Sequence, residues 1–324
     1  MYLNSTSILF FTSMIMGVIM SLSSNSWIMI WIGMEISLMS FVPTMVSKLK
    51  TSSESSMKYF IIQSISSAIF ILSVMFTLMG VNVNFTTSIA LSMMIKMGAA
   101  PFHSWVLSII NGMNYLSIFI LITLMKLTPM MIIMNLNQKN NMIIIACLIL
   151  GSISGLIQNS IYKIMVYSST FNMGFLIYSC NNFSIWILYF ALYSLNLALL
   201  FNILNQKKIL YLNQFMVNNH DLKLKMSIWI LMLSMSGFPP MLGFMSKLIV
   251  IELAIKFSDW IMVMIMILGS LITMFYYNRL CFISLFSSNL MVKWNLNSTD
   301  NKLIIVTIIN CTMLPTALLL KYLN

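Results

Sequence analysis

The chain has 324 residues, of which 60% are hydrophobic and only 7% carry a charge, against about 25% charged residues in a typical soluble domain. This composition excludes a soluble globular protein, because only a lipid environment explains so few charges. The formal net charge of +11 does not call for a nucleic-acid partner, since no basic domain with interleaved aromatic residues is present.

Hydrophobic runs close to the roughly 20 residues that cross a bilayer predict an all-α, polytopic membrane bundle of about eleven transmembrane helices. No polar stretch is long enough to fold alone, so residues 1–324 are predicted to form a single transmembrane domain. In chain order, the expected spans are about 5–23, 26–47, 58–80, 86–110, 115–136, 142–159, 162–180, 184–205, 225–254, 259–283 and 302–321.

The basic residues are distributed unevenly between the two sides of the predicted membrane. Most of the 17 lysines and arginines lie in loops that follow even-numbered spans. Positive loops stay on the inner side of a membrane. The pattern therefore predicts an N-terminus on the inner side and, with an odd number of spans, a C-terminus on the outer side.

Glycine and proline interrupt the fourth and the ninth span in matching ways. The first interruption lies within Lys96–His103 and the second within Ser236–Lys247. Because Pro101 has no N–H, it releases a carbonyl of the preceding helical turn. Paired interruptions of this kind indicate an ion pathway between inverted repeats. The repeats are expected over about 1–136 and 142–283, with 302–321 as an extra C-terminal helix.

Three lysines, Lys96, Lys126 and Lys247, are assigned to the interior of the predicted spans, and Glu35 lies near the middle of the second span. A charge in the membrane interior is expensive, so each is a candidate for proton translocation. Lys96 and Lys126 each precede a proline that frees a carbonyl, which predicts a polar pocket beside the ammonium group. Two alternatives stay open: Glu35 in a purely structural ion pair, and Lys247 with its head group reaching the membrane surface.

His103 and Lys163 are weaker candidates for a proton relay. An imidazole titrates near neutral pH and can pass protons along water, but His103 could equally cap the freed carbonyls. Lys163 begins the seventh span and could be only an anchor on the inner side. The sequence has no nucleotide-binding loop, metal-binding motif, haem ligand pair or iron–sulfur cysteine set. No cofactor is therefore expected in this chain.

Several motifs follow one another along the chain in a specific order and spacing. They are Ser24–Trp27 with Trp31–Glu35, Lys58–Phe60 with Gln63, Lys96–Trp105, Lys126–Pro129, Gln158–Ser169 and Gly237–Lys247. Taken together, they resemble the mitochondrial NADH–ubiquinone oxidoreductase chain 2 family, whose members are antiporter-like membrane subunits of respiratory complex I. The resemblance covers nearly the whole chain. The content of 34 methionines fits an AT-rich organelle genome, and this composition resembles that of an insect or similar invertebrate.

The resemblance implies roles for the four buried residues. Glu35 and Lys96 would be the paired glutamate and lysine, Lys126 the connecting lysine, and Lys247 the lysine of the second broken helix. This chain departs from the family where Asn172 and Phe175 replace a usual histidine and tryptophan, so no histidine relay is predicted in the second half.

The implied function is proton translocation coupled to electron transfer from NADH to ubiquinone, in a subunit without a redox centre. NAD, FMN, iron–sulfur clusters and ubiquinone are expected in other subunits of the enzyme. The implied partners are other complex I membrane subunits, including antiporter-like chains, and lipids such as cardiolipin. The implied location is the mitochondrial inner membrane, with the N-terminus in the matrix and the C-terminus in the intermembrane space.

A charge movement near Glu35 would weaken its hold on Lys96 and send the proton toward Lys126 and then Lys247. Two other functions remain open from the sequence. A free-standing secondary cation/proton antiporter would use the same broken helices, and a structural membrane spacer would need none of these charges.

Overall fold

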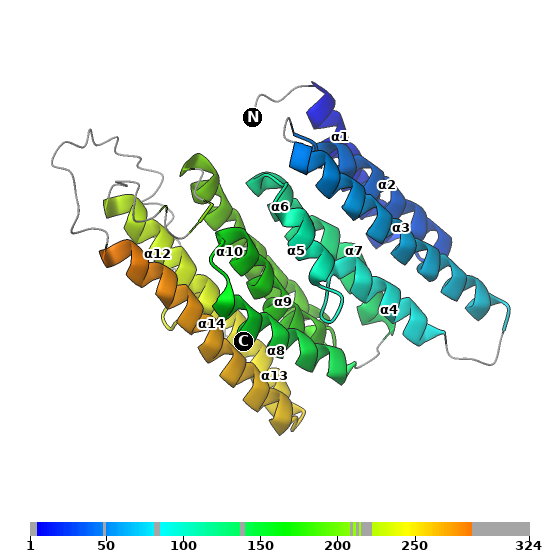
Figure 1. Cartoon of the computed structure of the whole chain (residues 1–324). Helices are drawn as coiled ribbons and strands as arrows, with labels where there is room; N and C mark the ends of the chain where they lie inside the picture. Colours follow the sequence, from blue (N-terminus) through cyan, green and yellow to red (C-terminus); the bar gives the residue numbers. More distant parts are fainter. Residues whose placement is uncertain are drawn as a thin grey trace. The chain divides into compact units, whose positions relative to one another are not determined.

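A computed structural model describes residues 5–47, 50–80, 85–136, 140–207, 210–211, 214 and 222–286 of the chain. Within these residues the protein is helical, with no strand beyond one isolated β-bridge between Ser160 and Tyr211. The first seven helices are α1 (Ser5–Ser23), α2 (Trp27–Met45), α3 (Lys50–Leu78), α4 (Thr86–Met97), α5 (Ser104–Ile110), α6 (Tyr115–Ile122) and α7 (Leu124–Leu136). The others are α8 (Asn141–Ile157), α9 (Ile161–Ser179), α10 (Phe183–Lys207), α12 (Leu222–Ser236), α13 (Leu242–Lys256) and α14 (Trp260–Phe286), as labelled in Figure 1.

These helices confirm the predicted all-α membrane bundle. Six of the described helical segments are long and apolar enough to cross a membrane. The fourth and ninth predicted spans are each divided into two helices, α4 with α5 and α12 with α13. Each half is too short to cross a bilayer alone. The eleventh predicted span, 302–321, lies outside the described residues.

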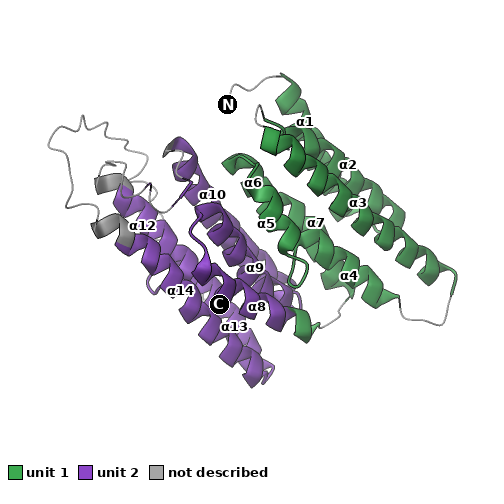
Figure 2. Cartoon of the chain, in the orientation of Figure 1, with its two compact units in different colours: residues 1–143 green, residues 144–324 purple. Residues whose placement is uncertain are grey.

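The chain divides into two compact units, residues 1–143 and 144–324 (Figure 2). In unit 1, α1 packs on α2, α2 on α3, and α3 on α4 and α5, while α7 contacts α1, α4 and α6. In unit 2, α9 packs against α10, α13 and α14, and α12 contacts α10, α13 and α14. Each unit therefore contains one span that is interrupted at glycine and proline and packed among other helices.

The closest helix pair in unit 1 is built on two glycines. A Cβ added to Gly17 of α1 would lie 2.8 Å from the carbonyl oxygen of Gly33 of α2, and one added to Gly33 would lie 2.8 Å from that of Gly17. Small residues let transmembrane backbones approach closely in this way. This contact fixes α2, which carries Glu35 two residues after Gly33.

Two boundaries differ from the predicted spans. Helix α3 begins at Lys50 and not near residue 58. The hydroxyls of Ser55 and Ser56 donate to the carbonyls three residues earlier, so these polar residues are accommodated within the helix. The fifth span is divided at Thr123, an interruption that was not predicted. There the Thr123 hydroxyl bonds back to the carbonyl of Phe119 at 2.7 Å, a contact that bends helices.

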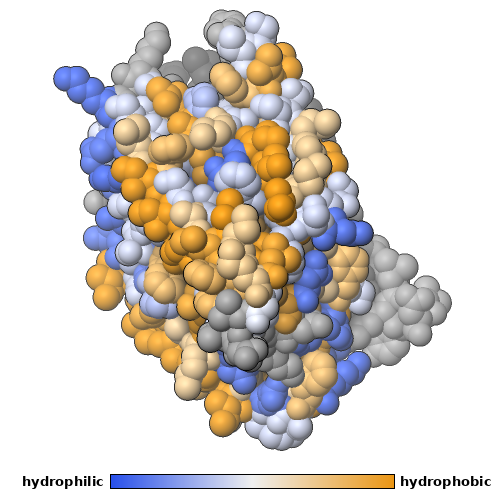
Figure 3. Space-filling view, turned by 90° about the vertical axis from the view of Figure 1, so that its right-hand side faces the viewer, coloured by the Kyte–Doolittle hydropathy of each residue, from blue (hydrophilic) through white to orange (hydrophobic). Residues whose placement is uncertain are grey.

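Large apolar side chains remain exposed along the outer helices. Figure 3 shows one face on which hydrophobic side chains cover much of the surface. Leu9 and Met16 of α1 are 62% and 57% exposed, and Ile261 and Phe275 of α14 are 75% and 65% exposed. Apolar surface on this scale is the surface of a protein in contact with lipid.

Candidate functional site

The first interruption ends α4 through a turn at Gly98. Gly98 has a φ of 66°, a left-handed conformation that glycine adopts without steric cost. Its N–H donates to Ile95 O at 3.1 Å, and the N–H of Ala99 donates to Met94 O at 3.1 Å. This pattern satisfies two of the carbonyls that a helix end leaves unpaired. A cis bond between Ala100 and Pro101 follows, and α5 begins at Ser104.

Side chains from neighbouring helices bind the carbonyls at this helix end. The indole Nε1 of Trp105 donates to Ile95 O at 3.1 Å. The amide Nε2 of Gln63, from α3, donates to Lys96 O at 3.2 Å. The interruption is therefore a polar structure whose carbonyls are bound by side chains of α3 and α5.

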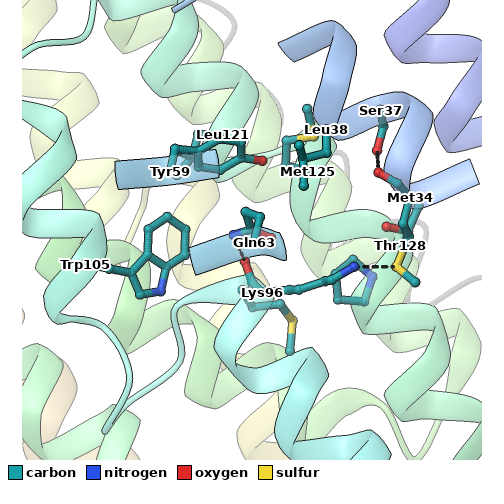
Figure 4. Close-up of a pocket in the computed structure, with 12 residues that line it drawn as sticks. Met34, Ser37, Leu38, Tyr59, Gln63, Lys96, Trp105, Leu121, Met125 and Thr128 are labelled. Atoms are coloured by element: carbon teal, nitrogen blue, oxygen red, sulfur yellow. Dashed lines mark hydrogen bonds between the residues drawn. The ribbon is translucent and has the colours of Figure 1, made fainter. Parts of the chain in front are cut away.

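A cavity with a water-accessible volume of about 20 Å³ lies beside this helix end. That volume is enough for at least one water molecule. Helices α2 to α7 all contribute to its wall, and Figure 4 shows the polar groups Tyr59, Gln63, Lys96 and Thr128 turned toward it. Its lining is Met34, Ser37, Leu38, Tyr59, Gln63, Lys96, Met97, Trp105, Leu121, Met125, Thr128 and Pro129.

The ammonium group of Lys96 points into unit 1 and not toward the membrane surface. The side chain is only 9% exposed, and its Nζ lies 3.7 Å from the sulfur of Met34 (Figure 4). Glu35, the next residue of α2, is half-buried and acts electrostatically on Lys96. No ion pair or hydrogen bond joins these two side chains among the described residues, and Oε1 of Glu35 is buried without a hydrogen-bond partner there. The two groups thus face each other without direct contact.

Lys126 and His103 occupy different places around this cavity. Lys126 of α7 is buried, with 4% exposure, and its neighbours Met125, Thr128 and Pro129 line the cavity while it does not. His103 is half-buried at the start of α5, outside the cavity lining, and its ring contacts the backbone of Pro101. Lys126 therefore lies on α7 next to residues that line the cavity, but it does not itself line the cavity.

The second interruption repeats the features of the first within unit 2. Gly237 has a φ of 84°, its N–H donates to Ser234 O, and the N–H of Phe238 donates to Leu233 O, both at 3.1 Å. A cis bond between Pro239 and Pro240 follows at the same offset from the glycine, and α13 begins at Leu242. Two stretches with little sequence in common thus end a helix by the same hydrogen-bond pattern.

Lys247 of α13 closes this second helix end. It is 6% exposed, and its Nζ donates to Ser236 O, the last carbonyl of α12, at 2.6 Å. Nζ also lies 5.3 Å from the centre of the Phe171 ring. The side chain therefore does not reach toward the membrane surface. Lys163, in the first turn of α9, is half-buried.

Three residues that line the cavity together with Lys96 were not among the predicted site residues. Tyr59 and Gln63 of α3 and Trp105 of α5 were noted only as parts of motifs. Tyr59 and Gln63 are four residues apart, so they lie on one helical face. A glutamine within an apolar span was the available signal for this role.

A model of the family described as NADH:quinone oxidoreductase/Mrp antiporter, transmembrane region, matches residues 24–273. The NADH-ubiquinone oxidoreductase chain 2 of Anopheles gambiae is 34% identical over 316 residues, covering 93% of this chain and 92% of the relative. The chain belongs to this family. The corresponding protein of Locusta migratoria is 33% identical and covers 94% of this chain and 93% of its own length.

Solved structures confirm the fold. A chain of respiratory complex I from Thermus thermophilus superposes with a TM-score of 0.82 at 16% identity, covering 97% of this chain and 78% of that one. A chain of the Mrp complex from Dietzia gives a TM-score of 0.74 at 15% identity, covering 82% and 57%. Both neighbours are chains of larger complexes. The chain is therefore a multi-pass membrane protein with an antiporter-like fold.

The described residues contain no group of three or more histidine, cysteine, aspartate or glutamate side chains that could hold a metal ion. The buried side chains of the described residues include three lysines from the predicted site, Lys96, Lys126 and Lys247.

Proposed function

We propose that this chain is a proton-translocating membrane subunit of respiratory complex I, which couples electron transfer from NADH to ubiquinone to proton pumping. The observation that carries the proposal is the buried Lys96 ammonium beside a cavity of about 20 Å³, with Glu35 within electrostatic range. The chain itself has no redox role in this proposal. It takes part in the enzyme's reaction by moving protons, while NAD, FMN, iron–sulfur clusters and ubiquinone belong to other subunits.

The separation of Glu35 from Lys96 supplies the switch. Two unit charges attract by about 4 kcal/mol at 4 Å and by about 2 kcal/mol at 8 Å, with an effective dielectric constant of about 20. Moving one elementary charge against 100 mV requires about 2.3 kcal/mol. A displacement of Glu35 by a few ångströms is thus of the right size to load or release a proton on Lys96.

The proposed route starts at Lys96 and continues over the cavity to Lys126. Met125, Thr128 and Pro129 of α7 line the cavity on the side of Lys126, which supports a water-mediated step between the two lysines. Lys247 is the proposed lysine of the second half, and His103 and Lys163 remain proposed relay residues.

The two interruptions support the proposal that residues of about 1–136 and 142–283 are inverted repeats within a single transmembrane domain. Both helix ends use a left-handed glycine, the same two hydrogen bonds and a proline at the same offset. Interrupted helices in paired repeats are the usual place for ion binding in transporters.

The proposed location is the mitochondrial inner membrane, with the N-terminus in the matrix and the C-terminus in the intermembrane space. The distribution of basic loops supports this orientation. The proposed partners are the other membrane subunits of complex I, including antiporter-like chains, and lipids such as cardiolipin around the exposed apolar helices.

The experiment that tests the proposal is the proton-to-electron ratio of assembled complex I carrying Lys96→Met. We expect a lower ratio than in the wild type, because methionine keeps the bulk of the stem but cannot carry a proton. Lys58→Met is the matched control, since Lys58 is exposed and pairs with Glu54 on the surface of α3. An unchanged ratio with Lys96→Met in fully assembled complex refutes the proposal.

A free-standing cation/proton antiporter is the second candidate, and the fold similarity to a chain of the Mrp complex favours it. This function predicts ion movement by the isolated chain in liposomes. The complex I proposal predicts none without partner subunits. A purely structural spacer predicts that Lys96→Met and Glu35→Gln both leave the ratio intact.

A further inference from the structure

Helix α9 is the enclosed core of unit 2. Every residue from Ile164 to Ser179 is buried, with α10, α13 and α14 packed around it. The helix nevertheless carries polar side chains, among them Ser168 and Asn172. Polar groups in the interior of a membrane protein usually make specific interactions. The contacts of Ser168 and Asn172 therefore indicate which polar groups meet in this core.

Asn172 is the centre of a group of buried phenols from α10. The Tyr189 hydroxyl donates to Asn172 Oδ1 at 3.1 Å. The Tyr193 hydroxyl faces the same carboxamide. Because Tyr189 and Tyr193 are four residues apart, they share one face of α10. The amide of Asn172 therefore binds the Tyr189 hydroxyl, and the Tyr193 hydroxyl lies close to it without a hydrogen bond within the described part of the chain.

Two further tyrosines reach the same group from α14. Tyr276 and Tyr277 are both buried, and their ring centres are 4.8 Å apart. Tyr277 contacts the Ser168 side chain, and Tyr193 interacts electrostatically with both Tyr276 and Tyr277. The network of Asn172, Tyr189, Tyr193, Tyr276 and Tyr277 thus joins three helices through polar atoms, and we call it the phenol network.

Several polar atoms of this region have no protein partner. The hydroxyls of Tyr193 and Tyr276 and Oδ1 of the neighbouring Asn196 are buried and make no hydrogen bond among the described residues. Buried polar atoms in folded proteins are almost always satisfied by protein or by ordered water. The Tyr193 and Tyr276 hydroxyls also interact electrostatically, so they provide two of the polar partners that a bound water molecule needs.

The phenol network and Lys247 meet the same face of α9. Ser168, Phe171 and Asn172 are spaced by three and four residues, so they lie on one helical face. Nζ of Lys247 lies 5.3 Å from the Phe171 ring, and Ser168 and Asn172 on either side of that ring contact the phenols. The ammonium and the network therefore both lie against this face of α9, with the Phe171 ring between the residues that contact the phenols.

We propose that the phenol network is a water-binding proton relay that serves Lys247. The proposal rests on the proton-translocating function proposed above and names its route in the second half. In each step a hydroxyl oxygen or water accepts a proton from one neighbour and releases its own hydrogen to the next. In this way one proton advances, and each O–H bond that breaks is replaced by one that forms on the same oxygen. The hydroxyl then rotates back to its original orientation and can accept the next proton. The Phe171 ring has no proton acceptor, so the step between the network and Lys247 requires a bound water molecule beside that ring. Asn172 is a positioning residue, which holds Tyr189 through its carboxamide.

The test uses assembled complex I carrying Tyr193→Phe or Tyr276→Phe. Each change removes one oxygen that bonds to no described residue, so the helices keep their described hydrogen bonds. We expect each variant to lower the proton-to-electron ratio to the value found with Lys247→Met, with unchanged thermal inactivation. Tyr178→Phe is the matched control on α9, because the Tyr178 hydroxyl donates to Asp259 at 2.8 Å and not to the network. We expect it to keep the wild-type ratio.

The results separate this relay from the function on which it rests. If Lys247→Met lowers the ratio but neither tyrosine variant does, the relay is refuted and proton translocation stands. If Lys96→Met and Lys247→Met both keep the wild-type ratio, the proposed function itself fails. A loss of the ratio in Tyr178→Phe equal to that in Tyr193→Phe also overturns the relay, because any buried phenol would then have the same effect.

Discussion

Replacing Gly237 with alanine should detach Lys247 from the end of α12. The new Cβ would lie 2.9 Å from Cδ and 3.2 Å from Nζ of Lys247, and 3.3 Å from Cε. The lysine stem must therefore move, and its 2.6 Å hydrogen bond to Ser236 O lengthens or breaks. We expect a lower proton-to-electron ratio, since the ammonium leaves its position beside Phe171.

The magnitude follows from two contributions. Holding a non-glycine residue in the left-handed conformation costs about 1–2 kcal/mol, and Gly237 has a φ of 84°. Losing a hydrogen bond that involves a charged group adds about 1.5–3 kcal/mol. Gly237→Ala should therefore destabilise the protein by about 2.5–5 kcal/mol if the bond is fully lost, and by about 1–2 kcal/mol if it survives.

Gly80→Ala is the matched control. Gly80 has a φ of 68°, and a Cβ there would meet nothing within 4 Å. It carries the same backbone cost without touching a lysine. The assay is the thermal inactivation of NADH:ubiquinone activity, measured with the proton-to-electron ratio in proteoliposomes. The reasoning is refuted if Gly237→Ala and Gly80→Ala have the same effect on both quantities.

Two further predictions concern the carbonyls at helix ends. Gln63→Leu removes the donor to Lys96 O and leaves a buried carbonyl unpaired. We expect the free energy of unfolding to fall by about 1–3 kcal/mol, measured as thermal inactivation at a lower temperature. Gln63→Glu has no amide N–H and should not restore the stability, and full stability in either variant would contradict the contact. Arg279→Met removes the donors to Leu156 O and Gln158 O, both at 2.7 Å, so the end of α8 should lose about 2–5 kcal/mol with the proton-to-electron ratio preserved. A shift no larger than that of the surface change Lys58→Met, about 0.5 kcal/mol or less, would show that Arg279 does not stabilise α8.

The broken helices show how far local sequence determines this protein. A proline removes a backbone donor wherever it stands in a helix, and glycine adopts a left-handed turn without a neighbour's help. The interruptions near Pro101 and Pro240 were therefore predictable from the sequence. The division at Thr123 was not, because the hydroxyl bond to the preceding turn that accompanies it also occurs inside uninterrupted helices, as at Ser152 of α8.

The partners of the buried groups depended on the tertiary structure. The sequence placed Glu35, Lys96, Lys126 and Lys247 inside the membrane by counting residues from the ends of each span. It could not tell that Met34 and not Glu35 contacts Lys96, or that Lys247 caps the end of α12. Hydrophobic periodicity gives the depth of a residue in the membrane, whereas which side chain faces it is set by the rotation and packing of helices that are distant in sequence. For the same reason, the tyrosines of α10 and α14 were ordinary aromatic residues in the sequence and became a polar network only when they met on α9.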